Sequence, residues 1–358
     1  MGNRDMANPK VAVVVPADRS GNSYREIEAA GCHVELADAS WSTGFNATEE
    51  AYLSLCANAD AVIGSRLEGL PITRERLSQL KNLRIYCRYN IGYDDIDLEA
   101  ASDLGIIVTN SPVESNWGSV AENTFALMLS MLKRIPERDR HVREGGWRED
   151  EPAARYIGRR LDGYEGLTVG LVGLGRVGSR MADLLQPWRV KLLAHDPYVD
   201  QSKFVHHNAI PVDMETLLQN ADVISLHCDL NDGSRSMINE KQFSLMKPTA
   251  IFLNTARGGL VDYDALFDAL DRNVIAGAGL DVFETEPLPK QSSILSLGDK
   301  VVLTPHSAGR TPGGINQNAI VMQTEILLTA LRGVVPKYVV NTEVLPKWRE
   351  RFGNKSLI

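Results

Sequence analysis

Positive charge is scarce in this sequence of 358 residues, which has 38 Lys and Arg against 46 Asp and Glu and a formal net charge of -8. A surface of this sign disfavours phosphodiester backbones and anionic lipid headgroups, so we expect neither nucleic acid nor a membrane as a partner. Long apolar runs are missing as well, because no stretch approaches the roughly 18 apolar residues that span a bilayer. The first residues, MGNRDMANPK, lack the apolar core of a secretion signal. We therefore expect a cytoplasmic protein.

Cysteine and histidine are too few and too scattered to indicate a metal site. The chain has 4 Cys and 7 His, with no CxxC pair and no HExxH arrangement. Neither zinc nor another metal is expected. The cysteines fall singly within apolar segments, where a reduced thiol packs as a small hydrophobic side chain. They are Cys32, Cys56, Cys87 and Cys228.

What the sequence does contain is a repeated alternation of short apolar runs and helical-period stretches. From residue 10 onward the runs VAVVVP, HVELA, DAVIGS, RIYCRY and IIVTN are separated by stretches such as SYREIEAA and ITRERLSQL. The same alternation restarts at Leu167 with LTVGLVG and continues to VVLTPH. Such alternation predicts parallel sheets with crossover helices, and the length of the chain suits two domains. We therefore predict an α/β protein with two doubly wound parallel-sheet domains.

A long helical pattern, SVAENTFALMLSMLKRIPERDRHV, separates the two domains. Its apolar residues, among them Val120, Phe125 and Leu132, cover more than one helical face and must be buried against something else. Two interpretations are open at this point: the helix belongs to the core of one domain, or it forms an interface between subunits, which its length favours. A second amphipathic helix, from Ile315 to Leu331, is expected to return to the first domain. The tail after Pro346 is expected to be weakly anchored.

A glycine signature opens the second domain. Gly173, Gly175 and Gly178 form a GxGxxG motif directly after an apolar strand and at the start of a helix. The first glycine permits a tight turn, the second lets the backbone approach a pyrophosphate, and the third lets the helix pack on the strand. The pyrophosphate would bind at the helix N-terminus, where unpaired N–H groups favour anions. Asp196, at the end of the next strand, is placed to bind ribose hydroxyls and to repel a 2'-phosphate, so we predict NAD as the cofactor.

Three polar residues follow strands of the second domain, where ligands bind in open α/β sheets. They are Arg257 in NTARGGLVD, Glu286 in GLDVFETEP and His306 in LTPHSAG. A guanidinium can bind a substrate carboxylate and polarise a 2-oxo group, while an imidazole can exchange the hydroxyl proton. A carboxylate beside the imidazole would hold its orientation. Taken singly, each residue is more often a surface charge or a structural side chain, and spacing alone does not unite them.

These residues are united by a resemblance. The motifs GLVGLGRVG, HDPY, SLHCDLN, NTARGGLVD and YNIGYDDIDLEAASDLGIIVTNSP are similar, in the same order, to motifs of the D-isomer-specific 2-hydroxyacid dehydrogenase family. The similarity extends over roughly Val11 to Leu331. It implies an NAD-dependent enzyme that interconverts a D-2-hydroxy acid and its 2-oxo acid by hydride transfer. The catalytic residues of the family fall on Arg257, Glu286 and His306.

The resemblance also implies the organisation of the chain. A Rossmann NAD-binding domain over residues 116–307 would be inserted into a flavodoxin-like substrate domain made of residues 1–115 and 308–358. Family members close the cleft between the domains on binding, and they commonly form dimers through the helix that matches residues 119–135. Further cofactor contacts carried over from the family are Arg176, Val177, Cys228, Thr255, Ala256 and Asp281.

Substrate contacts are expected from the first domain, and the implied partner is a small anionic 2-hydroxy or 2-oxo acid. The turn of Asn90, Ile91 and Gly92 offers backbone N–H groups that suit a carboxylate. Arg66 and Arg88 lie at expected strand ends of this domain, and Arg310 follows the catalytic histidine as a further cation. If these arginines point toward the substrate, it carries a second anionic group, such as a phosphate or another carboxylate. Otherwise they are ordinary rim charges.

Two alternatives to this function stay open. The motifs GLGRVG, SLHCDLN and NTARGGLVD are also similar to those of the C-terminal-binding protein corepressors, which use the same NAD fold as a scaffold for partners. Against a scaffold, Gly309 stands where those corepressors carry a pocket tryptophan. The other alternative is oxidation of a non-carboxylate oxyanion, because a guanidinium recognises charge and geometry more than carbon. A departure from the family, Asp229-Leu230-Asn231 in place of Pro-Leu-Thr, also leaves the loop near the cofactor open to change.

Overall fold

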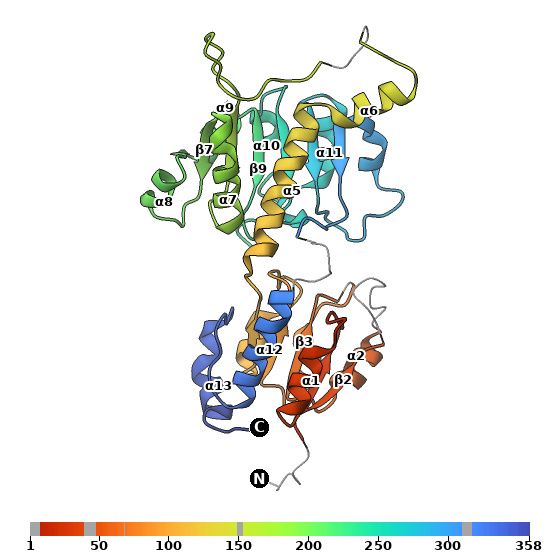
Figure 1. The fold of residues 1–358 in the computed structure, drawn as a ribbon, viewed down its shortest axis with the longest axis vertical. Helices are drawn as coiled ribbons and strands as arrows, with labels where there is room; N and C mark the ends of the chain where they lie inside the picture. The colour runs from red at the N-terminus through yellow and green to blue at the C-terminus, as the bar shows by residue number, and fades with distance from the viewer. Residues whose placement is uncertain (1–7, 39–47, 68, 149–152, 310–316) are drawn as a thin grey trace. The chain divides into compact units, whose positions relative to one another are not determined.

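The computed structural model of the chain describes residues 8–38, 48–67, 69–148, 153–309 and 317–358. The chain divides into two compact units (Figure 1). Unit 1 consists of Met1–Asn116 and Arg310–Ile358, and unit 2 of Trp117–Gly309. Unit 2 is therefore an insertion in the sequence of unit 1.

The described part of unit 1 is built on a five-stranded parallel sheet with the strand order β2-β1-β3-β4-β5. Its strands are short runs rich in β-branched and other apolar residues, which suit a sheet covered on both faces. The order 2-1-3-4-5 is that of a flavodoxin-like fold, as predicted. The strands are β1 Lys10–Val13, β2 His33–Leu36, β3 Ala61–Gly64, β4 Ile85–Arg88 and β5 Ile107–Thr109.

Helices cover both faces of this sheet. Successive side chains of a strand point to opposite faces, so Val11 and Val13 belong to one core while Ala12 and Val14 belong to the other. The predicted returning helix, α12, packs beside α1 and contributes to the core that contains Val11 (Figure 1). The helices are α1 Asn22–Ala29, α2 Glu49–Cys56, α3 Arg74–Gln79, α4 Leu98–Asp103, α12 Gln317–Leu331, η4 Thr342–Val344 and α13 Leu345–Phe352.

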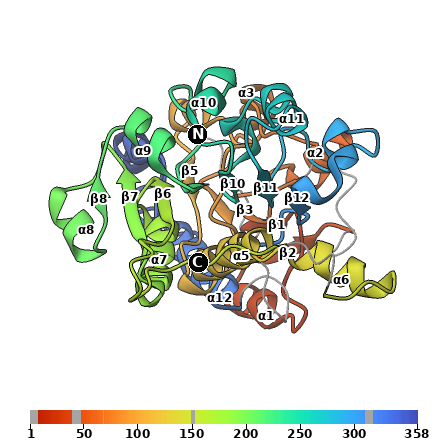
Figure 2. The ribbon, with the colours of Figure 1, turned by 90° about the horizontal axis from the view of Figure 1, so that it is seen from above.

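Unit 2 contains, among its described residues, a seven-stranded parallel sheet in the order β12-β11-β10-β9-β6-β7-β8. Figure 2 shows this sheet from β12 at one side to β8 at the other. Numbered from β6, this is the Rossmann order 3-2-1-4-5-6 with β12 added at one edge. The prediction of two parallel-sheet α/β domains is thus confirmed. The strands are β6 Thr168–Val172, β7 Lys191–His195, β8 Ile210–Pro211, β9 Val223–Leu226, β10 Ile251–Asn254, β11 Gly277–Leu280 and β12 Val301–Leu303.

The long helix α5 covers one face of the sheet of unit 2 (Figure 1). Its residues Leu127, Met128 and Leu132 share a buried core with Leu171 of β6 and Met181 of α7. This is the intradomain packing that one of the two interpretations of its sequence requires. The helices are α5 Glu114–Leu132, α6 Ile135–Arg143, α7 Arg176–Leu185, η1 Gln186–Trp188, α8 Gln201–His206, α9 Met214–Asn220, α10 Glu240–Leu245, η2 Gly258–Leu260, α11 Tyr263–Asp271 and η3 Ser293–Lys300.

The helical pattern between the domains corresponds to two helices rather than one. α5 begins at Glu114, before the predicted segment 119–135, and ends at Leu132. Arg134 then takes a left-handed conformation with φ of 51°, and Pro136 lies in the first turn of α6. Proline lacks the N–H that a continuing helix needs and clashes with the preceding turn, so a new helix begins here. Apolar periodicity alone does not show this break.

The four cysteines pack as reduced side chains, as their positions in apolar segments predicted. The four cysteines are free, and three of them are buried. Burial raises the thiol pKa of Cys56 and of Cys87 to about 12, which keeps both protonated as packing residues. Among the described helices, none combines the length and the apolar character needed to cross a membrane.

The C-terminal tail is firmly anchored, and the prediction of a weakly held tail is wrong. Trp348 of α13 is fully buried, and its Nε1 donates a hydrogen bond of 2.9 Å to the carbonyl oxygen of Arg84. The Arg84 guanidinium lies 4.9 Å from the ring centre of Phe352. A buried indole that also satisfies a backbone carbonyl fixes this helix on unit 1.

We expect Trp348→Ala to lower the free energy of unfolding of unit 1 by about 3–5 kcal/mol, because it leaves a cavity and removes one of the hydrogen bonds to the Arg84 carbonyl. Glu350→Ala, at an exposed position of the same helix, is the matched control and should change it by less than about 0.5 kcal/mol. Urea unfolding followed by circular dichroism measures both variants. Equal small effects would contradict an anchor at α13.

Candidate functional site

The glycine turn after β6 has a physical reason for each of its glycines. Gly173 has a φ of 95°, and a side chain there would approach the carbonyl oxygen of His227 to 2.7 Å. At Gly178 a Cβ would lie 2.2 Å from the carbonyl oxygen of Gly173. At Gly175, in contrast, no atom lies within 4 Å of a Cβ position, so the turn is open there. Gly173 and Gly178 therefore allow close packing of backbone against backbone, and Gly175 leaves room for a ligand.

The N-terminus of α7 suits an anion. The helix begins at Arg176 directly after Gly175, and no side chain caps its first turn. This turn contains no acidic residue. Unpaired amide groups and the helix dipole favour a pyrophosphate at such a position. Arg176 is exposed and Val177 is half-buried, so both border this opening.

Asp196 ties the end of β7 to the glycine turn. Its Oδ2 accepts a hydrogen bond of 2.7 Å from the amide of Leu174, and its Oδ1 accepts one of 3.0 Å from the amide of Tyr198. The carboxylate therefore lies beside the turn that would hold the pyrophosphate. That is the place from which a carboxylate reaches the adenosine ribose hydroxyls of NAD. The residues present fit this cofactor.

The residues at the ends of β9 and β10 complete the cofactor side of the sheet. Burial raises the pKa of the Cys228 thiol to about 11, so it is a protonated, apolar wall. The hydroxyls of Thr255 and Thr124 are hydrogen-bonded to each other at 2.6 Å. The Ala256 amide donates to Oδ1 of Asn254 at 3.0 Å, which holds the segment after β10 in place. Sequence reasoning missed His227, whose ring is buried and whose pKa is lowered by burial to about 4. It packs under the glycine turn as a neutral imidazole.

The three predicted catalytic residues follow three neighbouring strands. Arg257 comes after β10, Glu286 after β11 and His306 after β12, and these strands are adjacent in the sheet. Because the strands are parallel, their carboxyl ends lie on one edge of the sheet. The topology therefore brings these residues to the edge where β6 ends in the glycine turn.

The structure pairs His306 with Glu286. Nδ1 of the imidazole lies 2.8 Å from Oε2 of the carboxylate, and Oε1 of Glu286 accepts a hydrogen bond of 3.0 Å from the amide of Phe283. The His306 side chain is 41% exposed and that of Glu286 is 22% exposed. An oriented imidazole that solvent can reach is suited to exchange protons with a substrate. Arg257, which is half-buried, donates from Nη1 to the carbonyl oxygen of Ala256 at 2.7 Å.

Asp281 holds the loop that carries His306. Its buried carboxylate accepts hydrogen bonds from the Thr304 hydroxyl at 2.5 Å, the Ser307 amide at 3.0 Å and the Ala308 amide at 3.0 Å. His306 itself has a φ of 48°, a left-handed conformation that is uncommon outside glycine. Bonds on both sides of His306 therefore fix its backbone. The sequence indicated a contact of Asp281 with the cofactor but not this role.

In unit 1, the turn of Asn90, Ile91 and Gly92 follows β4. Its carbonyl groups are held, since Asn90 accepts from the Ser111 amide at 3.2 Å and Ile91 from the Asn110 side chain at 2.8 Å. Within the part of the chain that the structure describes, the amides of these three turn residues have no recorded acceptor. Backbone N–H groups require a partner, so consecutive amides of this kind suit an anion.

The arginines that the sequence proposed for substrate binding differ from one another. Arg66 lies at an exposed position after β3. Arg88 is fully buried, and its Nη2 lies 2.5 and 2.7 Å from the two carboxylate oxygens of Asp95. This geometry argues against a direct contact between Arg88 and a substrate, because the guanidinium is already paired. Arg310 lies outside the described residues.

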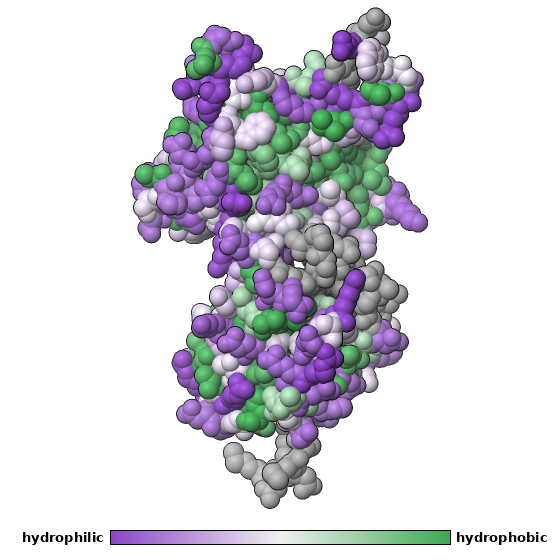
Figure 3. Space-filling view, viewed as in Figure 1, coloured by the Kyte–Doolittle hydropathy of each residue, from purple (hydrophilic) through white to green (hydrophobic). Residues whose placement is uncertain are grey.

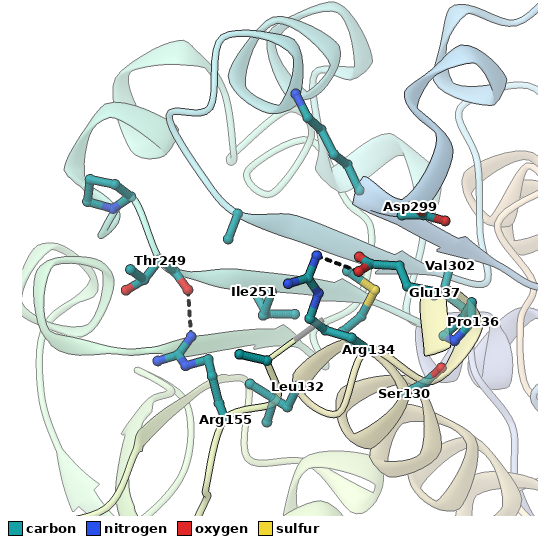
Figure 4. Close-up of a pocket in the computed structure, with 15 residues that line it drawn as sticks. Ser130, Leu132, Arg134, Pro136, Glu137, Arg155, Thr249, Ile251, Asp299 and Val302 are labelled. Atoms are coloured by element: carbon teal, nitrogen blue, oxygen red, sulfur yellow. Dashed lines mark hydrogen bonds and ion pairs between the residues drawn. The ribbon is translucent and has the colours of Figure 1, made fainter. Parts of the chain in front are cut away.

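An open cavity of about 540 Å³ in unit 2 lies at the edge of the sheet where the strands begin (Figure 4). It is lined by Ile251, the first residue of β10, and by Ala276, which precedes β11. Its arginines are occupied: Arg134 is paired with Glu137, and Arg155 donates to the Thr249 carbonyl at 2.6 Å. The cavity is therefore distinct from the catalytic edge, where ligands of parallel sheets bind.

Comparisons with known proteins agree with this geometry. The family described as D-isomer specific 2-hydroxyacid dehydrogenase, NAD binding domain, matches residues 125–308. A glyoxylate reductase of Korarchaeum cryptofilum is 36% identical over 310 residues, which cover 85% of this chain and 90% of the relative. A D-3-phosphoglycerate dehydrogenase of Methanocaldococcus jannaschii is 34% identical over 316 residues, 87% of this chain and 57% of the relative. The D-lactate dehydrogenase of Aquifex aeolicus, solved with NAD and lactic acid, has a TM-score of 0.77 at 27% identity and covers 94% of this chain and 98% of that one.

The resemblance stated from the sequence motifs is confirmed, and with it NAD as the cofactor. The matched region contains the glycine turn and all three predicted catalytic residues. On this basis the chain belongs to the D-isomer-specific 2-hydroxyacid dehydrogenase family, whose members are NAD-dependent oxidoreductases that interconvert 2-hydroxy acids and 2-oxo acids.

Proposed function

We propose that this protein reduces a small 2-oxo acid to the D-2-hydroxy acid and catalyses the reverse oxidation, with Arg257, Glu286 and His306 as the catalytic residues. The observation that carries the proposal is the His306–Glu286 pair, on the sheet edge where Arg257 and the glycine turn also lie. NADH, when bound, supplies the hydride for C2 of the 2-oxo acid. The protein then has to bind the acid, polarise its carbonyl and supply one proton.

His306 moves this proton. In reduction its ring donates a proton to the oxygen of the 2-oxo group, which becomes the hydroxyl, and in oxidation the ring takes the proton back. Glu286 occupies Nδ1, so Nε2 is the nitrogen that exchanges the proton. The Phe283 amide holds Glu286 in turn, which fixes the ring through the backbone.

Arg257 supplies positive charge for the oxygen that becomes electron-rich during reduction. A planar guanidinium can bind this oxygen and a carboxylate oxygen together, which fixes the face of C2. The amides of the Asn90–Gly92 turn supply a further anion-binding group for the carboxylate. Both groups bind the carboxylate and 2-oxo oxygens of the acid, and neither requires that the acid carry a large substituent.

The substrate that we propose is therefore of the size of glyoxylate or pyruvate, in keeping with the glyoxylate reductases among the relatives. Arg66 is the exposed arginine that we assign to a second anionic group where an acid carries one. Arg88 is left out of this assignment because its guanidinium is paired with Asp95.

For the cofactor, we propose that the pyrophosphate binds the amides that follow Gly173 and Gly175, next to Arg176 and Val177. Gly178 keeps the helix close enough to the strand for this contact. Asp196 binds the ribose hydroxyls. The nicotinamide end is assigned to Cys228, Thr255, Ala256 and Asp281, which follow β9, β10 and β11.

We also propose a homodimer formed through unit 2. Large apolar side chains between residues 135 and 161 are exposed: Ile135 by 52%, Val142 by 55%, Trp147 by 69%, Tyr156 by 50% and Leu161 by 98%. Apolar surface also gathers along α5 on the face shown in Figure 3. Exposed apolar side chains in such number mark a surface that a partner covers. A second copy of this chain is that partner, as the helix that follows the first domain led us to predict.

The cytoplasmic location that the sequence suggests is part of the same proposal. It is supported by the free cysteines, since a compartment that keeps thiols reduced suits a chain without disulfides among its described residues.

The test of the function is the variant His306→Ala. We expect kcat/KM for reduction of a 2-oxo acid to fall by about 10²–10⁴-fold, because the proton donor is lost. The Kd for NADH, measured by fluorescence, should change by less than about 2-fold, since the cofactor groups lie on other strands. His206→Ala, on α8, is the matched control and should leave turnover unchanged. Undiminished turnover in His306→Ala would overturn the assignment.

The same assay on the unmodified protein separates the alternatives. Glyoxylate, pyruvate, hydroxypyruvate and its 3-phosphate are offered with NADH, and we expect turnover of at least the first two. Binding of NADH without turnover of any acid would favour a scaffold of the corepressor kind. Reduction of NAD with phosphite alone, and with no 2-hydroxy acid, would favour oxyanion oxidation instead.

Asp281→Asn should lower kcat by about 10–100-fold with a change in KM of less than about 3-fold, because an amide nitrogen would face a backbone N–H and release the loop of His306. Thr304→Val removes only the hydrogen bond from the Thr304 hydroxyl to Asp281 and should give a smaller loss of kcat. Steady-state kinetics with saturating NADH measure the two variants. A rise in KM alone would show that Asp281 acts on binding rather than on His306.

Trp147→Asp should shift the protein from dimer to monomer at micromolar concentration, because it places a charge in an apolar interface. Val205→Asp, at a position 72% exposed on α8, is the control and should leave the dimer intact. Light scattering after size-exclusion chromatography gives the mass of each. A monomeric unmodified protein would refute the dimer without touching the enzymatic proposal.

A further inference from the structure

Arg88 is the most completely buried charged side chain near the candidate carboxylate turn. It ends β4, and its side chain has no exposed surface. Its Nη2 is paired with both oxygens of Asp95, and its Nη1 donates to the carbonyl oxygen of Ser65 at 3.0 Å. Its own carbonyl oxygen accepts from the hydroxyl of Ser111 at 2.8 Å. Arg88 is therefore bonded to three other residues, through its side chain and its backbone carbonyl.

These contacts join the segments that follow three neighbouring strands. Ser65 follows β3, Asp95 lies in the segment after β4, and Ser111 lies in the segment after β5. The strands are adjacent in the sheet of unit 1, so the three segments leave the sheet at one edge. A planar guanidinium with fixed donor directions can hold such segments in one arrangement, which a flexible ammonium group cannot.

The Arg88–Asp95 pair also spans the turn of Asn90, Ile91 and Gly92. Arg88 precedes the turn and Asp95 follows it, so the ion pair closes the segment at its base. Asp95 is itself held, because its carbonyl oxygen accepts from the Ile72 amide at 2.6 Å. The amides of the turn have no acceptor among the described residues, so they make no hydrogen bond that holds the shape of the turn. The buried Arg88–Asp95 pair is the restraint on the turn.

We propose that Arg88 is a positioning residue that fixes the carboxylate-binding turn through Asp95, and that it is not a ligand of the substrate. The inference rests on the proposed function, because it gives the Asn90–Gly92 turn its task. The pair sets the distance between the two ends of the turn, and the turn then presents its amides without further ordering when the acid binds. Binding of the acid depends on this pair, whereas the proton transfer at His306 does not.

The experiment uses Arg88→Lys and Asp95→Asn in the full-length protein. Each variant should raise KM for glyoxylate or pyruvate by about 10–100-fold, because the turn loses its shape, while kcat at saturating substrate changes by less than about 3-fold. Arg74→Gln removes an exposed ion pair with Asp103 in the same unit and serves as the matched control, with no change in KM.

Asp95→Asn separates positioning from direct binding. It leaves the Arg88 guanidinium in place and removes its counter-charge. If Arg88 were a substrate ligand, this change would free it for the acid, and KM would stay constant or fall. A rise in KM supports positioning. In the double variant Arg88→Lys/Asp95→Asn, KM should match that of either single variant, since the pair acts as a unit, and a multiplicative effect would overturn the inference.

Hydrogen exchange gives a readout that does not depend on turnover. The amides of Tyr89 and Ile72, which donate to Gly64 and Asp95, should exchange at least about 10-fold faster in both variants and not in Arg74→Gln. Unchanged exchange would overturn the inference even if KM rose. If the unmodified protein reduced no 2-oxo acid, the proposed function would fail, and faster exchange would still support the restraint of the turn. Turnover with faster exchange and an unchanged KM would leave the function standing and overturn the role of Arg88.

Discussion

The parallel direction of the strands is the constraint on which the rest of this structure depends. In both units, each described strand runs parallel to its neighbours, so the segments that follow the strands emerge at one edge of each sheet. In unit 2 the glycine turn, Arg257, Glu286 and His306 all follow strands and share that edge. The cavity of Figure 4 lies at the opposite edge and is lined by apolar and polar side chains, including arginines that are already bonded.

Aspartate carboxylates hold the loops that this topology places at the strand ends. Asp196 accepts from amides around the glycine turn, Asp281 from the loop of His306, and Asp95 from Arg88. Asp18, after β1, accepts from the amides of Ser20 and Ser23 in the same way. Burial alone would raise the pKa of Asp18, but its hydrogen bonds lower it to about 2, so the carboxylate stays ionised over the physiological range. A carboxylate accepts several hydrogen bonds at once, which makes it an efficient clamp for irregular backbone.

The sequence predicted the two parallel-sheet domains and the glycine turn, because both depend on local patterns of residues. An ordered set of motifs singled out Arg257, Glu286 and His306, which the fold places after neighbouring strands. Helical spacing alone did not predict the break between α5 and α6, although Pro136, in the first turn of α6, is a sequence signal for it. The anchoring of the tail was also missed, because the carbonyl that Trp348 bonds belongs to Arg84, far away in the sequence. A substrate contact of Arg88 was left open for a related reason. From the sequence alone, an arginine at a strand end is a candidate for ligand binding. Only the folded turn shows that Arg88 is already paired with Asp95.

The burial of Arg88 changes the electrostatics expected of the substrate site. A guanidinium that is paired with both oxygens of a carboxylate contributes little net field, so unit 1 offers fewer free cations than its sequence suggests. In the function that we propose, recognition of the acid in this unit falls to backbone amides, whose positions are set by geometry and whose charge does not change with pH. Amides select an oxyanion by direction and spacing rather than by total charge. We therefore propose that this site accepts the carboxylate common to all 2-oxo acids, and that discrimination among them depends on groups such as Arg66.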